Sequence, residues 1–92
     1  VPHIGWSEIN MSNESTKWQN TILKSNQPGD ALYFVHSFMA SPNDVKCCYS
    51  ECLYGDTKIV AVVIQDNITG CQFHPEKSGE MGLKILRNFL IQ

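Results

Sequence analysis

The chain has 92 residues, of which 42% are hydrophobic and 17% charged, a size that suits one small globular domain and leaves no room for a second core. Its net charge is −2, and its seven Lys and Arg residues are scattered, which argues against a nucleic-acid-binding face. The longest apolar run, residues 59–64, is far shorter than the roughly 20 residues that cross a bilayer, and the first residues lack a secretory signal pattern. We therefore expect a soluble, cytoplasmic protein that binds neither nucleic acid nor membrane.

The first thirty residues predict a short helix and a turn. Ser15 can act as the N-cap of this helix, because its hydroxyl can accept a hydrogen bond from a backbone N–H group of the first turn. The apolar residues that follow recur at helical spacing, and they are Trp18, Ile22 and Leu23. Residues 26–30 then predict a turn, since proline presets one backbone dihedral and glycine accepts a positive one.

The middle of the chain predicts extended structure. Residues 31–38 are rich in aromatic and branched side chains and are followed by loop-forming residues at 42–44, which indicates a strand and then a loop. Residues 45–53 form a second, more polar extended segment that ends before a turn at residues 55–56. The almost continuous branched aliphatic run of residues 58–64 predicts a buried strand.

The last part of the chain predicts a turn, a strand and a helix. Residues 66–67 form the turn, and residues 68–73 form a short strand that runs directly into residues 74–76. Residues 79–90 predict an amphipathic helix. Its expected apolar face consists of Met81, Leu83, Ile85, Leu86, Phe89 and Leu90. Three or four strands followed by one helix indicate an α/β or α+β layer architecture.

These elements do not make a complete doubly wound sheet. Such a sheet needs further βα units to cover both of its faces, and those units would have to precede Val1. The opening residues 1–6 include no methionine and resemble the interior of a fold. We therefore expect residues 1–92 to be part of one larger domain.

The four cysteines, Cys47, Cys48, Cys52 and Cys71, are expected to be free thiols. No secretory signal accompanies them, and a core this apolar does not need a disulfide framework. Cys47 and Cys48 are adjacent, so in an extended segment they face opposite ways, unlike the paired ligands of a zinc site. The sequence therefore predicts no metal site.

His74 and Glu76 place an imidazole and a carboxylate two residues apart at the end of a predicted strand, with Pro75 between them. A histidine that acts as a general base needs a partner that holds its tautomer and stabilises the imidazolium, and a carboxylate is the usual partner. The spacing alone also fits a surface pair or a structural pair, which are more common.

The segment around these two residues resembles a family signature. Residues 73–76, Phe-His-Pro-Glu, resemble the F-H-P-E signature of class I glutamine amidotransferases, and the longer stretch 72–79 is more specific still. Together with residues 2–6, 33–37 and 82–90, it is similar to the glutaminase subunits of imidazole-glycerol-phosphate synthases. Four ordered blocks spread over the chain make chance agreement improbable.

The resemblance implies a fold and an activity. The fold would be the carboxyl-terminal portion of a flavodoxin-like α/β amidotransferase domain, with several strands and a C-terminal helix. The whole enzyme would hydrolyse glutamine to glutamate and ammonia. The ammonia would pass to a synthase (cyclase) barrel subunit that makes imidazole glycerol phosphate in histidine biosynthesis. The glutaminase half would need neither a metal nor an organic cofactor.

The resemblance also implies roles for four residues close to the substrate. His74 matches the general base of the family and Glu76 its orienting acid. Ser37 and Phe38 match positions whose main chain meets the amino-acid end of bound glutamine. For Phe38, ordinary packing in a strand is equally compatible with the sequence.

Three further residues match family positions close to the face that docks on the synthase barrel, where ammonia must pass. These are Trp6, Tyr33 and Lys77, and each could equally fill the core or the surface. His3 and His36 are better explained as structural residues, because a lone histidine in an apolar segment is more often hydrogen-bonded than catalytic.

One part of the family pattern is missing, namely the nucleophile elbow, a cysteine between glycines that is followed by a helix. None of the four cysteines has that context, and the glycine-rich oxyanion loop is also absent from the sequence. Without a thiolate and an oxyanion site, we expect these 92 residues alone to be inactive.

Two alternatives stay open on the sequence alone. Paralogues that resemble this subunit supply ammonia for the amidino sugars of bacterial surface polysaccharides, and the glutaminase chemistry would be the same there. The other alternative is a noncatalytic domain that has kept the fold for regulation or for docking to a subunit, which the missing elbow would explain.

Overall fold

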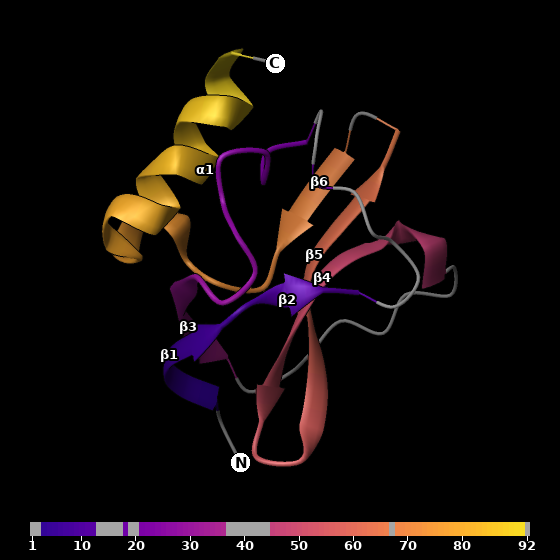
Figure 1. Cartoon of the computed structure of the whole chain (residues 1–92), viewed down its shortest axis with the longest axis vertical. Helices are drawn as coiled ribbons and strands as arrows, with labels where there is room; N and C mark the ends of the chain where they lie inside the picture. The colour runs from indigo at the N-terminus through magenta and orange to yellow at the C-terminus, as the bar shows by residue number, and fades with distance from the viewer. Residues whose placement is uncertain (1–2, 13–17, 19–20, 37–44, 67, 92) are drawn as a thin grey trace.

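The computed structural model describes residues 3–12, 18, 21–36, 45–66 and 68–91. The elements in chain order are β1 (His3–Glu8), β2 (Asn10–Met11), β3 (Ala31–His36), the 3-10 helix η1 (Val45–Cys47), β4 (Cys48–Tyr54), β5 (Thr57–Gln65), β6 (Ile68–Cys71), the 3-10 helix η2 (Pro75–Lys77) and α1 (Gly79–Ile91). In Figure 1, α1 lies at the upper left, and the strands lie to its right and below it. Several strands and a C-terminal helix confirm the expected α/β class.

The strands form two antiparallel sheets in the described part of the chain. β1 and β3 form a two-stranded ribbon in which Trp6 lies opposite Tyr33, and the second sheet has the order β2-β4-β5-β6. β5 and β6 confirm the predicted strands, with ends shifted by one or two residues. β3 confirms the predicted strand as far as His36, and residues 37–44 lie outside the described part. The parallel, doubly wound sheet that the resemblance implies for a whole domain stays a prediction.

One prediction about local structure is wrong, and a second fails in the part of it that the structure describes. In the segment expected to be extended from residue 45, the first three residues form η1, and β4 begins at Cys48. In the expected helix after Ser15, residues 21–25 form turns, while residues 13–17 and 19–20 lie outside the described part. The Thr21 hydroxyl donates to the Trp18 carbonyl at 2.6 Å, and such a local side-chain bond competes with helix formation.

The hydrophobic core joins the two sheets, the turns and the helix. Its buried members are Ile9, Trp18, Ile22, Leu23, Leu32, Phe34, Cys52, Ile59, Ala61, Val62, Phe73 and Ile85. The rings of Phe34 and Phe73 pack edge to face, with centroids 5.7 Å apart. This contact ties β3 to the residue that immediately precedes His74.

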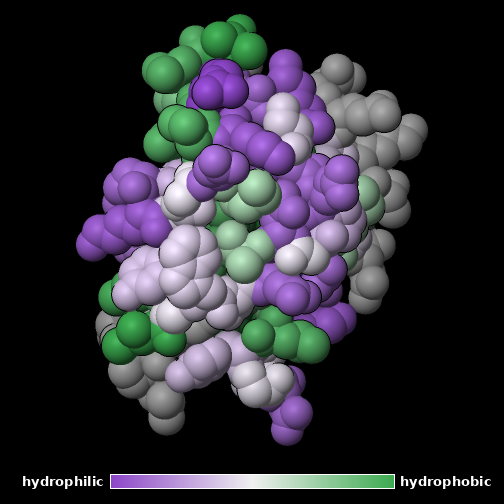
Figure 2. All heavy atoms as spheres, turned by 60° about the vertical axis from the view of Figure 1, so that its left-hand side comes forward, coloured by the Kyte–Doolittle hydropathy of each residue, from purple (hydrophilic) through white to green (hydrophobic). Residues whose placement is uncertain are grey.

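The helix α1 buries a narrower face than its sequence predicts. Its buried residues are Gly82, Ile85 and Asn88. Asn88 donates through Nδ2 to the Ile22 carbonyl at 3.2 Å, so a polar residue occupies part of the inner face. Three members of the expected apolar face are 51%, 53% and 79% exposed, and these are Leu83, Phe89 and Leu90 respectively. Figure 2 shows hydrophobic side chains gathered at the top of the view, over the end of α1.

No helix in the described residues is long and apolar enough to cross a membrane.

Candidate functional site

The His74–Ser78 segment forms one tight turn between β6 and α1. Pro75 stands in the first turn of η2, where its missing N–H is not needed and its fixed φ suits the helix. The N–H of Lys77 donates to the His74 carbonyl at 3.0 Å, and the N–H of Ser78 donates to the Pro75 carbonyl at 3.1 Å. The turn brings the side chains of His74 and Glu76 together at the surface.

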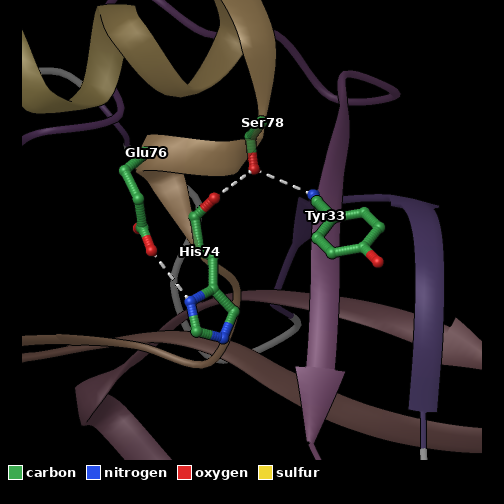
Figure 3. A network of polar contacts seen from close by, with 4 residues as sticks. All are labelled: Tyr33, His74, Glu76 and Ser78. Atoms are coloured by element: carbon green, nitrogen blue, oxygen red, sulfur yellow. Dashed lines mark hydrogen bonds and ion pairs between the residues drawn. The ribbon is translucent and has the colours of Figure 1, made fainter.

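His74 and Glu76 are in direct contact. The Nδ1 atom of His74 lies 3.0 Å from Oε2 of Glu76, and the two side chains are 40% and 58% exposed (Figure 3). With the proton of a neutral imidazole on Nδ1, facing the carboxylate, Nε2 keeps the lone pair that a general base uses. The arrangement can therefore take a proton from a group that approaches Nε2.

The Glu76 carboxylate is held in its charged form. Its pKa lies below the usual value, first because the backbone N–H of Glu76 bonds to it and second because the His74 side chain does. The charges of His74 and Lys77 lower this pKa further, while slight burial opposes them. Because the charged form is favoured in the folded state, the carboxylate remains available to His74 at neutral pH.

The turn is anchored to the backbone of β3. The N–H of His74 donates to the Tyr33 carbonyl at 2.8 Å, and the N–H of Tyr33 donates to the Ser78 hydroxyl at 2.9 Å. The Ser78 hydroxyl in turn donates to the His74 carbonyl at 2.6 Å. The edge of β3 therefore fixes both ends of the turn.

Two glycines allow α1 to begin immediately after the turn. Gly79 has φ = +61°, a left-handed conformation that glycine adopts without steric cost. A Cβ atom at Gly82 would overlap the carbonyl oxygen of Pro75 and would lie 2.7 Å from Cβ of Ser78. Only a residue without a side chain lets the helix approach the turn this closely.

The other predicted residues in the described part are Trp6, Tyr33 and Lys77. Lys77 lies in the turn itself, and Trp6 and Tyr33 lie on the β1–β3 ribbon. The rings of Trp6 and Tyr33 pack edge to face with centroids 5.7 Å apart, and Lys77 is an exposed residue of η2. A Cβ atom at Gly79 would lie 3.9 Å from the Trp6 ring, so Trp6 borders the start of α1. The predicted Ser37 and Phe38 lie outside the described residues.

The cysteines are free thiols, as expected. Burial raises the pKa of the Cys71 thiol to about 11. The pKa of Cys52 also rises to about 11, first through burial and then through the nearby charge of Glu51. Both thiols are protonated at neutral pH, whereas a nucleophilic cysteine needs a lowered pKa. Within the described ranges, no group of three or more His, Cys, Asp and Glu side chains could hold a metal ion.

Sequence analysis did not identify Ser78 and Gly82 as residues that shape the site. A serine immediately before a predicted helix suggests an N-cap, and a glycine within a helix suggests close packing. Neither signal says that the contact partner is the turn carrying His74.

Comparison with known proteins places the chain in a family. A sequence model described as "Glutamine amidotransferase class-I" matches residues 2–92. Among curated relatives, "Imidazole glycerol phosphate synthase subunit HisH 1" of Legionella pneumophila (strain Lens) is 49% identical over 90 residues, which are 98% of this chain and 42% of the relative.

Two further relatives carry the name "Imidazole glycerol phosphate synthase subunit HisH". The protein of Caldanaerobacter subterraneus subsp. tengcongensis is 45% identical over 97% of this chain and 41% of its own length. The protein of Lactococcus lactis subsp. lactis is 45% identical over 98% of this chain and 42% of its own length. The chain thus spans about two-fifths of the length of these relatives. It belongs to the class I glutamine amidotransferase family.

Proposed function

We propose that this chain supplies the general base and the orienting acid of a glutaminase that hydrolyses glutamine to glutamate and ammonia. The observation that carries the proposal is the contact of 3.0 Å between Nδ1 of His74 and Oε2 of Glu76. In this role, Glu76 holds the ring with its proton on Nδ1, and His74 exchanges protons with the reactants through Nε2.

The nucleophile in this proposal is a cysteine of a segment outside these 92 residues, which form part of one amidotransferase domain. The short span relative to the curated relatives supports this assignment. The raised pKa values of Cys52 and Cys71 support it too, since neither thiol is prepared to react.

In the proposed reaction, His74 carries each proton between the cysteine, the leaving ammonia and the attacking water. Nε2 of His74 takes the thiol proton as sulfur bonds to the amide carbon, and it gives that proton to the departing nitrogen, which leaves as ammonia. A water molecule then attacks the thioester, and His74 takes one of its protons. The carbon–sulfur bond breaks, glutamate leaves, and the proton returns to the cysteine. Main-chain groups of Ser37 and Phe38 would hold the amino-acid end of the glutamine.

We further propose that the partner is a synthase (cyclase) barrel subunit that uses the ammonia to make imidazole glycerol phosphate in cytoplasmic histidine biosynthesis. The names of the relatives, which are subunits of an imidazole glycerol phosphate synthase, support this proposal. Trp6, Tyr33 and Lys77 would face the barrel where ammonia passes. In support, Trp6 and its strand neighbour Ile4 are 56% and 61% exposed, which is unusual for large apolar side chains.

A chimera tests the glutaminase proposal. In the Legionella relative, the matched 42% is replaced by this chain, and glutamate release from glutamine is measured. We expect the chimera to release glutamate, and His74→Ala to reduce kcat by a factor on the order of 10³ or more, in line with the loss of a triad base.

Glu76→Gln has a matched control in Glu80→Gln, the same change four residues later on the exposed first turn of α1. We expect Glu76→Gln to lower kcat by a factor on the order of 10² or more, because the amide no longer stabilises the imidazolium, and Glu80→Gln to leave kcat unchanged. Equal effects of the two changes, or full activity of His74→Ala, would refute the proposal.

A further inference from the structure

The buried hydroxyl of Ser78 connects the turn that carries His74 to the strand β3. We infer that Ser78 is a positioning residue, whose hydroxyl fixes the backbone of His74 so that the imidazole meets Glu76. The Ser78 residue is 1% exposed, accepts the N–H of Tyr33 at 2.9 Å and donates to the His74 carbonyl at 2.6 Å. Figure 3 shows its oxygen between these two groups.

These hydrogen bonds are part of a closed cycle that includes the backbone N–H and the backbone carbonyl of His74. The N–H of His74 donates to the Tyr33 carbonyl at 2.8 Å, and the Tyr33 N–H returns to Ser78. His74 has φ = −104° and ψ = 98°, and the proline after it restricts these angles further. With its N–H and its carbonyl both held, His74 has its Cα–Cβ bond in one direction, and from there its ring reaches Glu76.

The packing around Ser78 leaves no simple replacement for the hydroxyl. Gly82 lies so close that a Cβ atom there would be 2.7 Å from Cβ of Ser78. Loss of the hydroxyl would therefore leave the partly buried N–H of Tyr33 and the His74 carbonyl without this partner, and a water molecule that replaced it would need a shift of the turn to make room. A displaced turn would carry the His74 ring away from the carboxylate.

This inference rests on the proposed function for its catalytic meaning, but the test does not need catalysis. The measurement is the tautomer of the His74 ring, read from imidazole ¹⁵N chemical shifts of the 92-residue chain at pH 9, where an ordinary imidazole is neutral. We expect mainly the Nδ1–H form in the unchanged chain. In Ser78→Ala we expect a loss of this form in favour of Nε2–H, because Glu76 no longer holds the ring.

A matched control is Ser50→Ala on β4. Ser50 is also fully buried, at 0% exposure, and its hydroxyl also donates to a backbone carbonyl, that of Asn10, at 2.9 Å. Ser50→Ala therefore reports the general effect of losing a buried serine hydroxyl. We expect the His74 tautomer ratio in this variant to match that of the unchanged chain. The same shift in Ser50→Ala and Ser78→Ala, or no shift in either, would overturn the inference.

A second variant covers the case in which Ser78→Ala does not fold. Ser78→Cys keeps the approximate size but replaces the hydroxyl by a thiol, which is a weaker donor and acceptor, so we expect a smaller shift in the same direction. In the Legionella chimera, Ser78→Ala should lower kcat at least tenfold with KM unchanged, since misplaced groups slow the reaction without touching substrate. The inference would be overturned if the His74 tautomer ratio were unchanged in Ser78→Cys and if kcat of the chimera were unchanged by Ser78→Ala. A chimera without any glutaminase activity would count against the proposed function alone.

Discussion

The turn around His74 and the outer face of α1 lie next to each other but differ in how they are held. Ser78 in the turn is almost fully buried, and Gly82 packs directly against it. The next residue, Leu83, is 51% exposed, and Leu90 at the far end of the helix is 79% exposed. The comparison teaches that contacts within the chain fix the geometry of the proposed base and acid. The apolar outer face of the helix contributes little to that geometry.

The strongest way to break the turn is to remove the aromatic contact behind it. Phe34 is fully buried and packs against Phe73, so Phe34→Ala should lower the free energy of unfolding by about 3–5 kcal/mol. Its neighbour Val35 is 39% exposed and faces the other side of β3, so Val35→Ala should cost less than about 1 kcal/mol. Urea denaturation measures both, and equal losses would contradict this account of the core.

The next largest effect is expected where the helix meets the turn. Gly82→Ala should lower the free energy of unfolding by about 1–3 kcal/mol, because the new methyl group would overlap the Pro75 carbonyl. This loss would occur although alanine is the better helix former by about 1 kcal/mol. On the outer face of the same helix, Leu90→Ala should change stability by less than about 0.5 kcal/mol. A stabilised Gly82→Ala would show that α1 lies further from the turn.

Thiol reactivity tests whether a second reactive centre exists outside the turn. With a pKa of about 11, Cys71 should carry on the order of a hundredfold less thiolate at pH 8 than an ordinary cysteine. We expect Cys71 to react with iodoacetamide at least that much more slowly in the folded chain than in the chain unfolded in urea, as followed by mass spectrometry of the peptides. Rapid alkylation of Cys71 in the folded chain would identify it as a competing nucleophile.

The smallest expected effect is the titration of Glu76. Its folded pKa is lowered, so the stabilising contact with His74 is present above the ordinary carboxyl pKa and is lost as the pH falls through the lowered value. Carboxyl ¹³C shifts should show this lowered midpoint. In His74→Ala the midpoint should rise only partway, because the larger cause, the backbone N–H of Glu76, remains. An unchanged midpoint would mean that His74 does not contact the carboxylate in solution.

Much of the fold could be predicted from the sequence, because its signals are local. The aliphatic run in β5 and the periodicity of α1 each specify their own element. β1 was not predicted, since its large side chains Ile4 and Trp6 point outward and leave no buried alternating pattern. Of the helix expected after Ser15, the described residues 22–25 form a turn, and the Thr21 hydroxyl donates to the Trp18 carbonyl beside it.

The candidate site divides in the same way. His74 and Glu76 could be found because they are two residues apart in a recognisable motif, and their contact is made within one turn. The part played by Ser78 could not be found, since its hydroxyl bonds to the backbone N–H of Tyr33, 45 residues away in the sequence. A backbone partner leaves no trace in residue identity, so only the structure brings these two segments together.

The most direct test of the account is glutamate release from glutamine by the 92-residue chain, alone and after addition of a separately made amino-terminal segment that carries the cysteine elbow of the Legionella relative. We predict no release by the chain alone, release by the mixture, and loss of that release with His74→Ala. Release by the chain alone that disappears when one of its own cysteines is replaced would contradict the account, because the nucleophile would then lie within these residues.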